Sequence, residues 1–170
     1  HTLSLHDALR SISQCFPSLK MTRFNTRAIV TGRSPLGESD CFADFISPSR
    51  GRVSAIVKGA YRSQRRFMGG FEPPSIMEVG FMTTSSVDRV LVEHADIAEP
   101  FAVLRSSPLR LARASVLIET GLLTVPMYQR SQEAYRLLET GLYLLQQAPD
   151  SDRWPLVYAF RLLSLAGLKP

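Results

Sequence analysis

The segment Ser49–Arg66, with the sequence SRGRVSAIVKGAYRSQRR, contains a predicted β-strand followed by a cationic loop. It holds six basic residues and no acidic residue, namely Arg50, Arg52, Lys58, Arg62, Arg65 and Arg66. The whole chain has a formal net charge of +5, so the remaining residues together carry −1. This local basicity is typical of a surface that binds a polyanion such as a nucleic acid. The alternative is the charged, solvated face of an ordinary strand.

Predicted strands lie on both sides of this segment. Alternating or β-branched residues predict five strands, at Phe24–Thr31, Asp40–Ile46, Arg52–Lys58, Ser75–Met82 and Val87–Glu93. Gly32–Gly37 is predicted to be a turn, and Gly59–Gly70 a long loop between the third and fourth strands. Five short strands with one long loop at this place favour an OB-type β-barrel. An SH3-like barrel is the nearest alternative.

Helical periodicity replaces the β pattern from Ile97 onward. Ser107 and Pro108 supply an N-cap and a proline at the first helical position. Helices are predicted at Leu109–Thr124, Ser131–Gln147 and Trp154–Ala166, with a possible short helix at Glu99–Arg105. Their inward-facing residues are predicted to be Leu109, Ala112, Val116, Leu117 and Leu123 in the first, Tyr135, Leu137, Leu138, Gly141, Leu142, Leu144 and Leu145 in the second, and Phe160, Leu163 and Leu165 in the third.

The predicted fold class is therefore α+β, with an N-terminal five-stranded OB-type barrel followed by a small all-α helical domain. We expect the barrel domain over residues 21–96 and the helical domain over residues 97–170. Residues 1–20 do not fit this pattern, and their start, HTLSLHDALR, resembles the conceptual translation of a sequencing-library adapter. We expect a non-native leader there, with Met21 as the natural start. Because the last helix ends without a tail, we also expect the helical domain to be incomplete.

The composition argues against several classes of function. No run approaches ~18 uncharged apolar residues, so no membrane-spanning helix is expected. Cys41 and His94 are the only cysteine and histidine after residue 20, which argues against a structural zinc site and a Cys–His catalytic pair. The sequence contains neither a GxxxxGK[ST] phosphate loop nor a GxGxxG motif. We therefore expect no cofactor and no enzymatic activity, and interpret as a solvated face the acidic residues Glu72, Glu78, Asp88 and Glu93.

The loop after the third strand carries the most informative motif, KGAYRSQRRF at Lys58–Phe67. Gly59 allows the chain to bend out of the sheet. Tyr61 and Phe67 either stack on bases or close the barrel core. The loop arginines are predicted to reach a phosphate backbone: Arg62, Arg65 and Arg66.

These motifs, in their order and spacing, resemble the bacterial RecO family of DNA repair and recombination mediators. The similarity runs from about Met21 to Pro170. It rests on the following pieces: Ala28-Ile29-Val30, GESD at Gly37–Asp40, Gly51, AIVKGA at Ala55–Ala60 with the arginine cluster after it, FEPP at Phe71–Pro74, and FRLLSLAGLKP at Phe160–Pro170. By itself, GESD reads as a polar turn before a strand, with cation binding as the alternative.

The resemblance implies an OB fold followed by a helical domain. It also implies binding of single- and double-stranded DNA, annealing of complementary strands, and loading of recombinase with RecR on DNA coated by single-strand-binding protein. The resemblance further implies a cytoplasmic, nucleoid-associated location. The family's DNA-contacting basic residues carry over onto Arg50, Arg52, Lys58, Arg62, Arg65 and Arg66, to which the motif adds Tyr61. Family members often have a cysteine zinc site, for which this sequence offers no basis.

A second hypothesis comes from the same basic loop. The chain would then be a protein-interaction adaptor whose loop binds the acidic tail of a partner, with little direct affinity for DNA.

Overall fold

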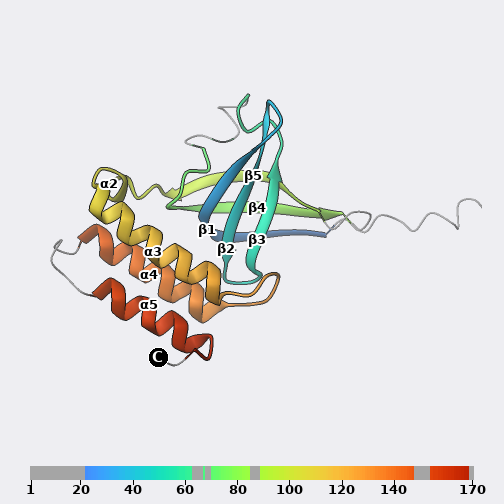
Figure 1. Ribbon diagram of the computed structural model, residues 1–170. Coiled ribbons are helices and arrows are strands. Elements are labelled where there is room, and N and C mark those ends of the chain that lie inside the picture. The colour runs from blue at the N-terminus through green and yellow to red at the C-terminus, as the bar shows by residue number, and fades with distance from the viewer. Residues whose placement is uncertain (1–21, 63–66, 68–69, 85–88, 148–153, 169–170) are drawn as a thin grey trace, which may run out of the picture.

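The computed structural model places residues 22–62, 67, 70–84, 89–147 and 154–168. In this part of the chain, strands are followed by helices, and the helices lie on one side of the sheet (Figure 1). The strands are β1 (Thr22–Leu36), β2 (Asp40–Ser47), β3 (Gly51–Val57), β4 (Ser75–Thr84) and β5 (Arg89–Glu99). The helices are α2 (Ala102–Arg105), α3 (Pro108–Thr124), α4 (Gln132–Gln147) and α5 (Trp154–Leu165).

The strands form a closed barrel in the order β1-β2-β3-β5-β4. β1 spans 15 residues, which lets its first half pair with β4 and its second half with β2. The ring is completed by a short parallel contact between β3 and β5, at Ala55 with Val90 and Ile56 with Leu91. This arrangement confirms the predicted OB-type barrel followed by helices.

The predicted turn at Gly32–Gly37 is wrong, because β1 continues to Leu36 and stays paired with β2. A register shift between Val30 and Gly32 marks a bulge in the strand. The reversal falls after Leu36, where Gly37 has a φ of 67° that suits glycine. Here the cross-strand pairing outweighs the local turn preference of glycine and proline.

Inward-facing side chains of all five strands fill the barrel. Three aromatic rings occupy its centre, with Phe45 at 5.2 Å from Phe81 and at 6.0 Å from Phe71 between ring centroids. Phe67 is 3% exposed and belongs to the same cluster, which favours core closure over base stacking for this residue. Such aromatic contacts add to the free energy gained by burying the rings.

A second apolar core lies between the barrel and the helices. Three isoleucines on the outer barrel surface, Ile29, Ile46 and Ile76, are fully buried there. The helices contribute the remaining large side chains of this core, among them Phe101, Leu104, Leu117, Leu138, Leu142, Leu145 and Leu162. The predicted core residues Tyr135, Leu138, Leu142 and Leu145 of α4 are confirmed as buried.

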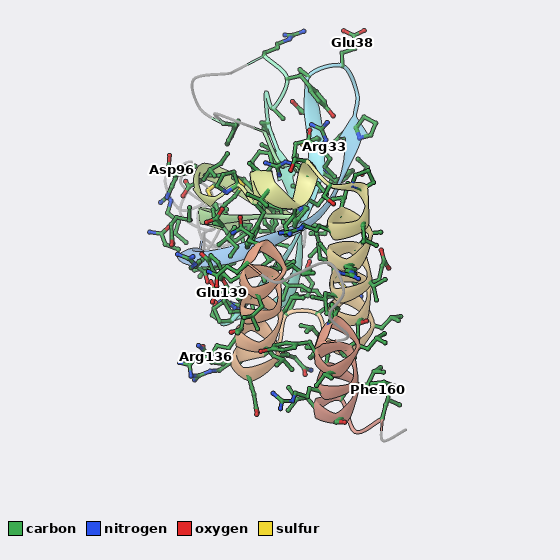
Figure 2. The ribbon with its side chains drawn as sticks, turned by 90° about the vertical axis from the view of Figure 1, so that its left-hand side faces the viewer. Arg33, Glu38, Asp96, Arg136, Glu139 and Phe160 are labelled. Atoms are coloured by element: carbon green, nitrogen blue, oxygen red, sulfur yellow. The ribbon has the colours of Figure 1, made fainter. Side chains whose placement is uncertain are left out.

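The outward faces of α3 and α5 differ from the prediction. Four residues of α3 that were predicted to face inward are exposed, namely Leu109, Ala112, Val116 and Leu123. The barrel and the neighbouring helices pack on the opposite side of the helix, at Ala114, Leu117, Ile118 and Gly121. In α5, Leu162 is fully buried, while Phe160 and Leu165 are exposed. Figure 2 shows Phe160 pointing away from the helices. Leu144 of α4, also predicted inward, is 37% exposed.

The loop between α3 and α4 attaches to the barrel through backbone hydrogen bonds. Arg52 donates its backbone N–H to the Pro126 carbonyl at 3.0 Å and accepts from the Tyr128 N–H at 3.1 Å. Ser131 donates to the Pro48 carbonyl at 3.0 Å. The loop therefore continues the hydrogen bonding of β3 beyond the ring of strands.

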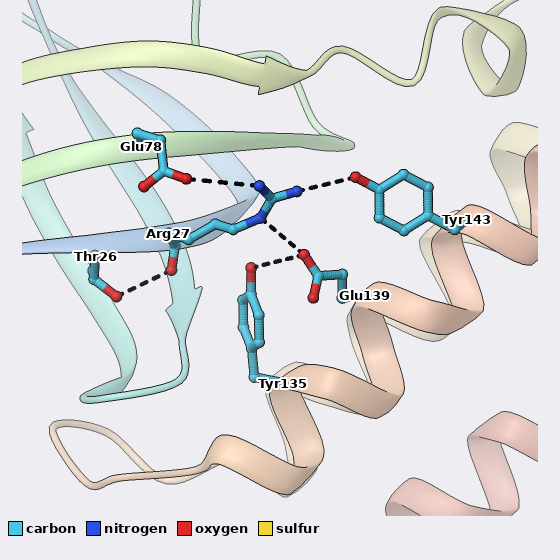
Figure 3. A network of polar contacts seen from close by, with 6 residues as sticks. All are labelled: Thr26, Arg27, Glu78, Tyr135, Glu139 and Tyr143. Atoms are coloured by element: carbon cyan, nitrogen blue, oxygen red, sulfur yellow. Dashed lines mark hydrogen bonds and ion pairs between the residues drawn. The ribbon is translucent and has the colours of Figure 1, made fainter.

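A polar network joins the barrel to α4 (Figure 3). Arg27 of β1 donates to the Glu139 carboxylate at 2.9 Å and to the Tyr143 hydroxyl at 3.0 Å. Its guanidinium also lies 3.6 Å from Glu78 of β4. The Tyr135 hydroxyl donates to the same Glu139 oxygen at 3.3 Å. One arginine thus connects two strands with one helix.

Candidate nucleic-acid interface

The basic segment identified in the sequence is divided by β3. Arg50 precedes the strand, while Lys58, Tyr61 and Arg62 follow it. A strand of seven residues separates the two ends by about 23 Å. Lys58 and Arg62 therefore lie at the barrel end away from the helices, where the β1–β2 turn and the chain directly after β3 lie side by side (Figure 1).

The β1–β2 turn holds the start of this loop. Gly59 donates its backbone N–H to the Asp40 carboxylate at 2.8 Å, and Tyr61 donates to the Ser39 carbonyl at 3.1 Å. Arg62 closes a local turn by donating to the Gly59 carbonyl at 3.1 Å. The GESD motif is therefore a polar turn, as predicted, and it also positions the basic loop.

The loop side chains are available to a ligand. Lys58 and Arg62 are exposed and form no ion pair with any residue that the structure places. Tyr61 is 47% exposed, so part of its ring is accessible to a ligand. The nearby Asp40 carboxylate is engaged by the Gly59 N–H and the Ser39 hydroxyl. Two cations beside an exposed aromatic ring suit contact with phosphates and bases.

An apolar strip on the outer barrel surface continues from this loop. Phe42 of β2 lies opposite Ile56 of β3, and Ile56 lies beside Leu91 of β5. Phe42 and Leu91 are half-buried, so part of each side chain faces solvent. Phe42 was not among the binding residues predicted from the sequence. Phe42 could have been found from the strand alternation, because it is an aromatic residue at an outward position, between the buried Cys41 and Ala43.

Arg50 and Arg52 occupy different surroundings from the loop cations. Arg50 is exposed, and its guanidinium lies 4.9 Å from the centre of the Phe24 ring in a cation–π contact. Arg52 is half-buried, and its Nη1 donates to the Leu122 carbonyl of α3 at 2.7 Å. Arg52 thus supports the junction between barrel and helices. The remaining predicted contacts, Arg65 and Arg66, lie outside the described residues.

Other kinds of site have little support in the described ranges. No group of three or more His, Cys, Asp or Glu residues there could hold a metal ion. Cys41 is buried in the barrel core, and this burial raises the pKa of its thiol. A neutral, buried thiol is a poor nucleophile. None of the described helices is long and apolar enough to cross a membrane.

Comparison with known proteins gives one consistent result. The sequence profile described as "Recombination protein O N terminal" matches residues 21–101, and the one described as "Recombination protein O C terminal" matches residues 105–170. Together they cover the barrel and the helices α3, α4 and α5.

Curated relatives with the name "DNA repair protein RecO" agree with these profiles. The protein of Syntrophobacter fumaroxidans is 33% identical over 152 residues, which cover 89% of this chain and 59% of the relative. That of Symbiobacterium thermophilum is 30% identical over 152 residues, covering 88% and 59%. That of Myxococcus xanthus is 28% identical over 150 residues, covering 88% and 61%. This chain spans about three-fifths of the length of these relatives, and it belongs to the RecO family.

Proposed function

We propose that this chain acts in DNA repair and recombination by binding DNA at the basic end of its barrel. The observation that carries this proposal is the group of Lys58, Tyr61 and Arg62, which are exposed and held by the β1–β2 turn. Family membership supports the repair role. The apolar strip of Phe42, Ile56 and Leu91 extends this surface toward the middle of β2 and β3.

The mechanism follows from the chemistry of these side chains. Lysine and arginine neutralise phosphates and release counterions, which drives binding without reading the sequence. Exposed aromatic rings stack on unpaired bases, whatever their identity. Neutralised strands repel each other less, so two complementary strands can approach and anneal. In the same proposal the chain binds single- and double-stranded DNA and helps to load recombinase with RecR on DNA coated by single-strand-binding protein.

The test is the salt dependence of binding to a fluorescein-labelled dT oligonucleotide. The triple variant Arg62→Ala, Arg65→Ala, Arg66→Ala should bind more weakly. Because each lost phosphate contact on single-stranded DNA lowers the slope of log K against log salt by about 0.7, the slope should fall by up to about two. A variant with Arg136→Ala and Arg161→Ala on the helices is the control and should keep the wild-type slope. An unchanged slope in the triple variant would contradict the proposal.

A second candidate function is binding of an acidic partner tail. One structural observation favours it, a groove of about 490 Å³ between α4 and α5 whose lining includes Arg136, Arg161, Leu137 and Leu165. Two arginines beside apolar side chains suit a peptide that carries both carboxylates and apolar residues. This groove lies on the helices, whereas the sequence predicted that such a tail would bind to the basic loop.

The two candidates separate in one pair of measurements. An acidic peptide ending in an apolar residue should lose affinity for the Arg136→Ala, Arg161→Ala variant if the groove binds it. It should lose affinity for the loop triple variant if the loop binds it. A wild-type protein that binds the peptide but no oligonucleotide would favour the adaptor and refute direct DNA binding.

A further inference from the structure

A mainly apolar pocket that contains a few polar groups lies where the outer surface of the barrel meets the helical side. Its volume is about 300 Å³, at the lower end of the range for small-ligand pockets. Strands β1, β2 and β3 form its floor, while Leu122 of α3 and Met127 of the α3–α4 loop form an apolar wall. The hydrogen bonds between this loop and Arg52 fix Met127 beside the pocket. The proposed DNA surface described above does not include this pocket.

The polar groups of the pocket have few partners in the protein. The Asp44 carboxylate is half-buried and has no hydrogen-bond or ion-pair partner among the residues that the structure places. Thr31 Oγ1 and Arg52 Nε, which belong to lining residues, are buried without a hydrogen-bond partner in the same part of the chain. Polar groups of this kind are usually satisfied in native proteins, by protein, water or ligand.

Gly32 keeps the carboxylate accessible. A β-carbon at this position would lie 3.5 Å from Asp44 Oδ2, in the space beside the carboxylate. Gly32 does not have a positive φ, so its backbone conformation does not require glycine. The absence of a side chain therefore leaves room in the pocket, and any larger residue would fill it.

The pocket lies on the same outer face as the proposed DNA surface. Along β3, Ile56 and Ser54 lie on the same outer side, Lys58 comes just after the end of the strand, and Ser54 lines the pocket. Along β2, Phe42 and Asp44 also lie on this side, and Asp44 lies opposite Ser54. Lys58 and Ser54 are about 13 Å apart along the strand. A single strand whose phosphates contact the loop cations can therefore follow this face to the pocket.

We propose that this pocket takes an unpaired guanine base from single-stranded DNA, a proposal that rests on the DNA-binding function above. A carboxylate offers two acceptor oxygens side by side. Guanine is the DNA base whose pairing edge presents two adjacent N–H donors, N1–H and the 2-amino group. In adenine and cytosine an acceptor nitrogen lies next to the amino group, and in thymine carbonyls flank the single N–H. Reading of an extruded base by its pairing edge and by apolar contacts is a known mode of recognition.

The other pocket groups complete this recognition. The hydroxyl of Ser54, which lies opposite Asp44 in the pocket lining, is a donor suited to the O6 carbonyl of guanine. Leu122 and Met127 cover a face of the ring, and the thioether of methionine adapts to aromatic surfaces. In this proposal Asp44 gives the pocket its preference for guanine over the other bases. The loop cations give the protein its affinity for single-stranded DNA of any sequence.

The experiment compares fluorescein-labelled dT15 with the same oligonucleotide carrying one central dG, deoxyinosine, dA or dC. The wild-type full chain should bind the dG oligonucleotide about tenfold more tightly than dT15, in the range for one bidentate base contact. Deoxyinosine, which lacks the 2-amino group, should lose most of this preference. The dA and dC oligonucleotides should behave like dT15.

Two variants test whether the preference for guanine depends on the pocket. Asp44→Asn should abolish the tenfold difference and keep the affinity for dT15 and the salt slope. Gly32→Val should do the same by filling the pocket, provided that its circular dichroism spectrum and melting temperature show a folded protein. Equal wild-type affinity for dT15 and dG oligonucleotides would overturn the guanine site and leave the proposed function intact, as would a preference that survives in Asp44→Asn. Failure of the wild type to bind any oligonucleotide would instead refute the proposed function.

Discussion

Asp40 and Gly59 are joined by a hydrogen bond of 2.8 Å from the Gly59 backbone N–H to the Asp40 carboxylate. The two residues are far apart in the sequence, at the start of β2 and just after the end of β3. This contact, with the one from Tyr61 to Ser39, holds the basic loop against the β1–β2 turn. The position of the candidate DNA surface therefore depends on a turn that carries acidic residues.

Replacing Asp40 tests this connection. Asp40→Ala should lower the free energy of unfolding by about 1–2 kcal/mol, because a hydrogen bond to a charged acceptor is lost. Asp40→Asn keeps an acceptor oxygen and should lose less than half of that amount. Urea unfolding followed by circular dichroism gives both values. Equal losses in the two variants would show that the hydrogen bond is not the cause.

Gly51 is expected to be the most sensitive glycine of the barrel. It has a φ of 63°, and a β-carbon there would collide with the backbone carbonyl oxygens of Pro126 and Gln129. Gly37 has a similar φ of 67°, but no atom lies within 4 Å of the position of its β-carbon. Gly37→Ala should therefore lower the free energy of unfolding by about 1–2 kcal/mol, because of backbone strain alone.

Gly51→Ala should lower the free energy of unfolding by more than about 3 kcal/mol. In addition to the backbone strain, the new β-carbon would collide with backbone atoms that cannot move freely. Thermal unfolding of both variants measures the difference. Similar melting temperatures would mean that the α3–α4 loop does not pack against Gly51 as described.

The Arg27–Glu139 pair should contribute measurably to the attachment of α4 to the barrel. Arg27 bonds Glu139 at 2.9 Å and Tyr143 at 3.0 Å, with side-chain exposures of 37% for Arg27 and 22% for Glu139. A double-mutant cycle with Arg27→Met and Glu139→Gln should give a coupling of about 1 kcal/mol.

The pair Arg23–Glu93 is the matched control. It has the same 2.9 Å separation, but the Arg23 side chain is 63% exposed. Solvent screens such a pair, so the corresponding cycle should give a coupling of at most about 0.5 kcal/mol. Raising the salt concentration to 1 M should reduce the Arg23–Glu93 coupling by the larger fraction. Equal couplings would contradict the role assigned to Arg27.

Alkaline pH should destabilise the protein through Tyr135. Burial raises the pKa of its phenol above the ordinary value of 10.0, and the nearby Glu139 carboxylate adds to the shift. The folded state therefore retains a proton that the unfolded state releases. The stabilisation is complete below pH ~10 and falls above it, by about 1.4 kcal/mol for each further pH unit.

The variant Tyr135→Phe cannot ionise and should lack this component. Its free energy of unfolding should be lower near pH 8, because the hydrogen bond to Glu139 is lost, and should decline less steeply above pH 10. Urea titrations between pH 8 and 11 give both slopes. Parallel slopes in the two proteins would show that Tyr135 ionises as readily in the folded state as in the unfolded state.

Local pattern was enough to predict much of the architecture. Alternation of side chains predicted the barrel strands, and capping by Ser107 predicted the start of α3, where its hydroxyl accepts from the Arg110 N–H. It was also enough to locate the basic loop and the apolar stripe of α4. These features depend on interactions between near neighbours in the chain, which the sequence displays directly.

The tertiary structure decided what depends on distant partners. The length of β1 depends on its pairing with β2. Which sides of α3 and α5 are buried depends on the packing of the barrel and the neighbouring helices. Arg50 and Arg52 belong to the same charged run as Lys58, yet one lies at the far end of the strand and the other supports the helical junction. The pocket around Asp44 forms only where Gly32, Ser54 and Leu122 meet. Burial and pairing are properties of the assembled chain, so charge and periodicity along the sequence determine them only in part.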